Sequence, residues 1–190
     1  PNIKSKLTIY DSVSLEDLVA NETLDVAIIN GPIKNKILKY IELYTSKLVL
    51  IASNEISYNL IDEQSITDTY PLVNLKDIEN QNFILLREVT RLGRLTRNIF
   101  MQNNVNPTNI IDVDNINSAI SMTYVNIGFS FIPEYLVQKD LIDKKMINVF
   151  TINDNDYFLP IIIVYKEEKM KNPSVKAFIE FVYQNYKIKY

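Results

Sequence analysis

The hydrophobic pattern of the chain changes from strand-like to helix-like within one stretch, residues 83–100. Residues 83–86 (FILL) form a short apolar run, which is typical of a strand that is covered on both faces. Over residues 92–100, apolar side chains then recur at helical spacing, and Thr90 stands where an N-cap residue belongs. The stretch therefore predicts a buried strand that leads directly into the first turn of a helix.

Other segments repeat this alternation of strand and helix along the chain. Apolar runs predict strands at 7–10, 24–31, 48–52, 110–113, 129–132, 147–152 and 159–165. Capping patterns predict helices that begin near Ser14, at Ile116 and at Pro173, and Asn126 is suited to end the second of them, with Gly128 turning the chain into the next strand. Strand, helix and strand in this order predict an α/β fold with parallel crossovers.

A polar stretch without periodicity, residues 53–80, separates two such blocks and predicts a crossing between lobes. We expect residues 1–80 and 153–190 to form lobe I and residues 81–152 to form lobe II. Each lobe would then contain its own sheet.

Four arginines lie around the predicted helix start, at positions 87, 91, 94 and 97. Arginine is usually favoured at the other end of a helix, so guanidinium groups beside the positive N-terminus suggest that an anion binds there. The alternative is a solvated face with no ligand, because surface charge often has no further meaning.

Composition narrows the possible functions of the 190-residue chain. Its net charge is −3 without any block of like charge, so direct binding to nucleic acid by this segment is not expected. The chain has no histidine and no cysteine, which removes the commonest general base and the usual zinc ligands. We expect no metal and no cofactor. No apolar run is long enough to span a membrane.

The order of these segments resembles the effector-binding domain of LysR-type transcriptional regulators, which has two lobes and is similar to type 2 periplasmic binding proteins. The resemblance rests on LDVAIING at 24–31, KLVLIAS at 47–53, FILLREVTRLGRL at 83–95 and the helix followed by NIGFSFIP within 113–136, and the closing strand and helix at 159–186 agree with it. It implies an α/β fold of two Rossmann-like lobes with mixed, mostly parallel sheets.

This chain departs from the family pattern in three ways. Val89 and Arg91 replace the glycines that flank the family's serine or threonine, and Asn126 replaces the first glycine of its GxGxxxxP motif. The family's first strand and helix and its DNA-binding helix-turn-helix precede the segment that matches Pro1, so the chain is expected to be a fragment. In the family, the turn in that preceding segment supplies hydroxyl and amide contacts to the effector, so the residues of one cleft wall are not assigned from this sequence.

The resemblance implies a sensor that binds a small effector between its lobes. We expect Thr90 and nearby backbone amides to hold a carboxylate or similar anion, with Arg87 or Arg91 adding a charge-assisted bond. Facing it from lobe I would be Gly31, Pro32 and Ile33. The remaining wall would be formed by Asp114, Asn115, Ser130, Phe131 and Ile132, although Phe131 and Ile132 are better suited to the core.

The family also implies partners and a location. These are a homodimer or homotetramer, DNA contacted only through an N-terminal helix-turn-helix outside this chain, no membrane, a cytoplasmic location and no enzymatic activity. One alternative is a solute-binding receptor of the periplasmic type. The other is an enzyme similar to prephenate dehydratase, because the tripeptide at 90–92 is similar to the Thr-Arg-Phe motif of that family.

Overall fold

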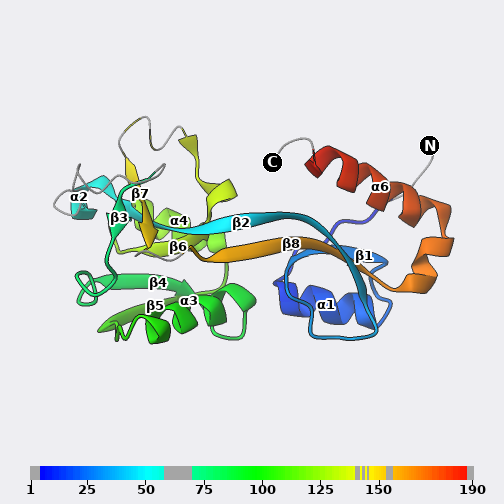
Figure 1. Ribbon diagram of the computed structural model, residues 1–190, viewed down its shortest axis with the longest axis horizontal. Helices are drawn as coiled ribbons and strands as arrows, with labels where there is room; N and C mark the ends of the chain where they lie inside the picture. The colour runs from blue at the N-terminus through cyan, green and yellow to red at the C-terminus, as the bar shows by residue number, and fades with distance from the viewer. Residues whose placement is uncertain are drawn as a thin grey trace. The chain divides into compact units, whose positions relative to one another are not determined.

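The computed structural model describes residues 5–57, 70–139, 142, 144, 146–152 and 156–187 (Figure 1). The chain divides into two compact units. Unit 1 comprises Pro1–Thr45 and Leu159–Tyr190, and unit 2 comprises Ser46–Phe158. None of the helices in the described part of the chain is both long and apolar enough to cross a membrane.

Unit 1 is a sheet that packs against helices on both faces. Its elements are α1 (Ser12–Ala20), β1 (Val26–Asn30), the first part of β2 (Lys39–Ser53), β8 (Phe158–Tyr165), η4 (Glu167–Lys171) and α6 (Pro173–Lys187). Alternate residues of β8 point to opposite faces, as strand geometry requires. Ile162 packs with Val19 of α1, whereas Ile163 packs with Ile179 of α6.

Unit 2 contains two groups of strands. In the first, β4 (Asn82–Leu86) and β5 (Asn109–Val113) pair in parallel and are joined through α3 (Arg91–Gln102). The second group and the remaining helices are the end of β2, α2 (Asn54–Ser57), β3 (Leu72–Val73), α4 (Ile116–Tyr124), β6 (Ser130–Pro133), η3 (Glu134–Leu136) and β7 (Ile147–Ile152). An aromatic cluster fills the core: the ring of Phe100 lies 4.8 Å from that of Phe83 and 5.4 Å from that of Phe131, edge to face in both pairs.

The predicted helix ends are mostly confirmed. Helix α3 begins at Arg91 with Thr90 as its N-cap, α4 begins at Ile116, and α6 begins at Pro173. Asn126 has the expected left-handed conformation, with φ of 65°. Gly128 has a negative φ, so its role is a different one: a Cβ atom there would lie 2.4 Å from the carbonyl oxygen of Asn82. The glycine therefore permits a close approach to the start of β4.

Two local predictions near the N-terminus are wrong. Residues 7–10 form no strand, and the side chains of Leu7 and Ile9 are 88% and 84% exposed. A short apolar run forms a strand only where a neighbouring strand pairs with it. The first helix is capped by Asp11 and not by Ser14: Oδ1 of Asp11 accepts hydrogen bonds from the amides of Val13 and Ser14.

The expected predominance of parallel strands is also wrong, because β1–β8, β2–β6 and β2–β7 are antiparallel. Only β3–β7 and β4–β5 are parallel among the described ladders. A parallel pair needs a crossover between its strands, and β4, α3 and β5 supply one in direct succession. The β8 strand instead returns beside β1 from the far end of the sequence in the opposite direction.

The bounds of the compact units differ from those of the expected lobes. Leu50 of β2 pairs with Phe131 of β6 and with Phe150 of β7, so the second half of β2 belongs to unit 2. The expected bounds of the regulatory lobes themselves stay a prediction.

Candidate functional site

The junction between β4 and α3 is fixed by Thr90. Its Oγ1 accepts a hydrogen bond from the amide of Gly93 at 3.0 Å and donates one to the carbonyl of Arg87 at 2.8 Å. The residue is 6% exposed. Because the hydroxyl already donates and accepts within the chain, its direct effect is to hold the first turn of the helix against the preceding loop.

Gly93 brings that turn into unusually close contact with the end of β4. A Cβ atom at this position would lie 2.1 Å from the carbonyl oxygen of Arg87 and 2.4 Å from that of Leu86. No side chain fits between these backbone atoms, so only glycine allows the approach.

Two of the four arginines bind carbonyl groups of the junction itself. Arg94 donates from Nη1 to the carbonyl of Val89 at 2.9 Å. Arg97 donates from Nη1 to the carbonyl of Leu86 at 2.8 Å and forms an ion pair with Asp112 of β5. These two guanidinium groups therefore stabilise the backbone around the helix start.

The other two arginines differ in exposure. The side chain of Arg87 is 59% exposed, and its guanidinium forms a 2.6 Å ion pair with Asp114, whereas Arg91 is buried, with 8% of its surface exposed. Since Leu86 and Val113 are partners in the parallel ladder, Arg87 and Asp114 follow the carboxyl ends of two adjacent strands. Asn115 caps α4, with Oδ1 accepting from the amide of Ser118 at 2.9 Å. Two helix N-termini and one exposed guanidinium thus lie at one end of the strand pair.

The three expected site residues on β6 have buried side chains. Ser130 is completely buried, and its hydroxyl donates to the carbonyl of Ile84 at 2.9 Å. Phe131 belongs to the aromatic cluster described above, and Ile132 packs with Val49 and Val149. Their side chains form the core behind the two helix starts.

The expected site residues of unit 1 lie in the loop after β1. Gly31 is buried and its amide donates to the carbonyl of Pro160 at 2.7 Å, Pro32 is exposed, and Ile33 packs partly against the core of the unit. The sequence analysis missed Glu16, which is 3% exposed and accepts hydrogen bonds from this loop. The sequence feature that could have revealed Glu16 is a carboxylate on the same helix face as the apolar residues Val19 and Ala20.

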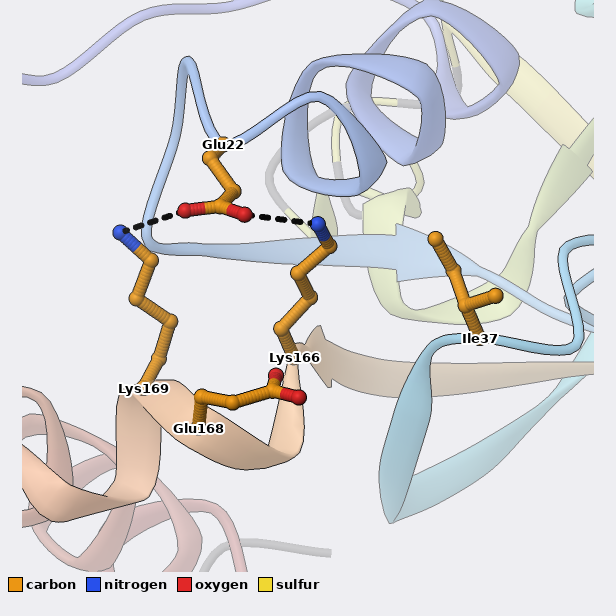
Figure 2. A pocket seen from close by; sticks show the side chains of 5 residues that line it. All are labelled: Glu22, Ile37, Lys166, Glu168 and Lys169. Atoms are coloured by element: carbon orange, nitrogen blue, oxygen red, sulfur yellow. Dashed lines mark hydrogen bonds and ion pairs between the residues drawn. The ribbon is translucent and has the colours of Figure 1, made fainter.

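A separate hollow of about 460 Å³ in unit 1 is lined by Glu22, Ile37, Lys166, Glu168 and Lys169 (Figure 2). Lys166 and Lys169 approach the carboxylate of Glu22 from two sides, at 2.8 and 3.9 Å. The hydrogen bond from Lys166 lowers the pKa of Glu22, and the bond to Asp25 raises the pKa of Lys169. These charges neutralise one another, and none of the expected site residues lines the hollow.

Comparison with protein families gives one match that covers nearly all of this chain. Residues 1–187 match the model described as LysR substrate binding domain. The chain belongs to this family. Among curated relatives, a "Probable RuBisCO transcriptional regulator" of Thalassiosira pseudonana is 22% identical over 160 residues, which cover 81% of this chain and 50% of the relative. This LysR substrate binding domain thus spans about half the length of that regulator.

Solved structures support the same fold. The "Effector binding domain of QuiR in complex with shikimate" has a TM-score of 0.75 and 19% identity, covering 95% of this chain and 80% of that one. The regulatory domain of CcmR from Synechocystis PCC6803 in complex with 2-PG has a TM-score of 0.68 and 13% identity, covering 93% and 80%. This LysR substrate binding domain therefore has the mixed α/β fold, similar to type 2 periplasmic binding proteins, that the resemblance implied.

Proposed function

We propose that the chain is the ligand-sensing domain of a LysR-type transcriptional regulator and that its effector is a small carboxylate or related anion. The observation that carries the proposal is the exposed Arg87 guanidinium beside the N-termini of α3 and α4. Helix N-termini favour negative charge, and ligands of open α/β sheets bind beyond the carboxyl ends of strands. The similarity to a domain in complex with shikimate, a carboxylate, supports the same ligand class.

The first turn of α3 and the side chain of Arg87 are the proposed anion contacts, with Arg91 contributing positive charge from below the surface. Thr90 acts by keeping this turn in place. Asp114 is the resident counter-ion of Arg87, so an incoming carboxylate competes with Asp114 for the guanidinium. Asn115 holds the neighbouring helix start.

In unit 1, the loop of Gly31, Pro32 and Ile33 is proposed to contribute further contacts to the effector. The Ser130–Ile132 segment supports the floor of the site from the core. An effector shifts a two-lobed protein between arrangements only if it binds one arrangement more tightly, so contacts from both lobes are required.

The whole regulator is proposed to act as a homodimer or homotetramer in the cytoplasm, and to contact DNA through a helix-turn-helix outside this segment. Its relatives are transcriptional regulators. The proposed role of this domain is binding and signal transmission, without a catalytic step.

Calorimetry with matched probes tests the anion site. Shikimate and benzoate are titrated beside their uncharged counterparts, methyl shikimate and benzyl alcohol. Arg87→Gln should weaken binding of an acid that the wild type binds by about fivefold, since an exposed charge contact contributes about 1 kcal/mol. Asp114→Asn should strengthen binding because it removes the competing carboxylate.

Lys76→Gln is the control for the Arg87 variant. Lys76 precedes the start of β4, whereas Arg87 follows its end, and Lys76 also pairs with a carboxylate, that of Glu79, at 2.6 Å. Its replacement therefore makes the same change of charge away from the proposed site. The proposed site is wrong if the acids bind Arg87→Gln and Asp114→Asn as they bind the wild type, or if the uncharged counterparts bind equally well.

A further inference from the structure

A buried carboxylate lies beneath the loop that follows β1. Glu16 of α1 is 3% exposed, and its Oε1 accepts hydrogen bonds from the amides of Lys34 and Asn35 at 2.7 and 2.5 Å. Burial of a carboxylate is unfavourable unless hydrogen-bond donors replace the lost water. The two amides are such donors, and bonds from N–H groups to a charged acceptor are among the stronger ones in proteins.

The arrangement resembles an anion site that the chain fills by itself. Two consecutive amides converge on a single oxygen atom, which is the geometry that backbone nests offer to bound anions. The conformation of residues 34–35 is therefore tied to the position of one side chain on the helix.

Helix α1 also holds the beginning of the same loop. The amide of Asn30 donates to Oγ of Ser12 at 3.1 Å, one helical turn before Glu16. The next amide, that of Gly31, donates to the carbonyl of Pro160 at 2.7 Å. The segment between these attachments, Pro32 and Ile33, is thus fixed from both sides, by Ser12 and Pro160 before it and by Glu16 after it.

We propose that Glu16 is the positioning residue for the effector contacts of unit 1. It does not touch the ligand but sets the path of Gly31, Pro32 and Ile33, which the proposed function assigns to ligand contact. The inference rests on that proposed function. It adds a specific dependence: ligand affinity should follow the ability of residue 16 to accept two hydrogen bonds.

Glu16→Ala and Glu16→Gln separate this role from simple packing. Alanine leaves the amides of Lys34 and Asn35 without their acceptor. Glutamine keeps an oxygen in the same place and loses only the charge, so it should largely restore both the loop and the binding. Val19→Ala is the matched control, because Val19 is buried in the same helix and its truncation weakens the core without touching the loop amides.

Hydrogen exchange of the amides of Lys34 and Asn35, measured by NMR on the whole chain, reports on the loop directly. We expect exchange of these two amides to accelerate at least tenfold in Glu16→Ala and to stay near the wild-type rate in Glu16→Gln and Val19→Ala. Calorimetry with shikimate as the probe should show affinity falling several-fold in Glu16→Ala alone.

The outcomes distinguish this inference from the proposed function. Unchanged exchange in Glu16→Ala, or faster exchange with unchanged affinity for the probe, would overturn the positioning role. Equal loss of affinity in Val19→Ala would overturn it too, since general weakening of the unit would then explain the effect. If the wild type binds no acid, the proposed function fails, and the exchange rates still decide whether Glu16 holds the loop.

Discussion

Removal of the Thr90 hydroxyl should destabilise the chain by a predictable amount. The hydroxyl satisfies the amide of Gly93 and the carbonyl of Arg87, and both bonds lie at a residue that is 6% exposed. Thr90→Ala removes these bonds together with a methyl group. Thr90→Ser removes the methyl group and keeps the hydroxyl, so the difference between the two variants isolates the cap.

The magnitude follows from the two contributions. Loss of an N-cap costs about 1–2 kcal/mol, and loss of a buried methyl group costs about 0.8 kcal/mol. Thr90→Ser should therefore lower the free energy of unfolding by about 0.8 kcal/mol, and Thr90→Ala by about 2–3 kcal/mol.

Urea unfolding followed by far-ultraviolet circular dichroism measures both variants against the wild type. The slope of the free energy of unfolding against urea concentration should stay unchanged, because neither substitution alters the surface exposed on unfolding. If the alanine and serine variants unfold at the same urea concentration, the two hydrogen bonds contribute nothing and Thr90 does not hold the helix start.

Four further substitutions test other parts of the structure. In the same urea assay, Gly93→Ala should destabilise the chain by more than about 3 kcal/mol, because the added Cβ meets two backbone oxygens. Gly31→Ala should cost less, because a Cβ atom there meets only side-chain atoms, the nearest at 3.1 Å. Ser130→Ala should lower stability by about 1 kcal/mol and leave the affinity for shikimate unchanged, since its hydroxyl is bonded to Ile84; an effect on affinity alone would contradict this. Lys166 lowers the pKa of Glu22, so that carboxylate contributes stability above its unfolded pKa that is lost as pH falls through its folded pKa. Glu22→Gln should flatten the acid side of the stability curve, and an identical slope in the variant would refute the interaction.

Local patterns in the sequence predicted the β4–α3 junction well. Four successive apolar residues followed by a threonine and a helical stripe have few other interpretations, and α3 begins at the predicted residue. Asn126 was equally informative, because asparagine tolerates a positive φ better than most residues. These features depend on neighbours within a few positions of the sequence.

Strand direction and strand pairing could not be predicted in the same way. The β8 strand lies beside β1, more than a hundred positions away, and no local pattern specifies that antiparallel partner. The first part of β2 was missed because residues 39–47 alternate charged and apolar side chains irregularly. Leu7 and Ile9 carried a strand-like pattern without a partner strand, so the pattern produced no strand.

In the candidate site, too, local features were predicted from the sequence and contacts between distant residues were not. Residue types indicated an arginine-rich helix start, but not which guanidinium groups bind the chain itself. In the structure, Arg94 and Arg97 bind carbonyl groups of the chain, and Arg87 pairs with Asp114. The role of Glu16 depends on a loop eighteen positions away, so the sequence analysis missed it.

The contact at Gly93 limits how this part of the protein can move. With backbone touching backbone and Arg97 bonded to the carbonyls of both Leu86 and Gly93, the helix has no room to slide along the strand. Binding of a ligand at the beginning of α3 would therefore displace β4, the following loop and α3 together as one block. Changes in ligand preference are then easier at outward-facing positions such as Val89, where a new side chain alters the surface and leaves the block intact.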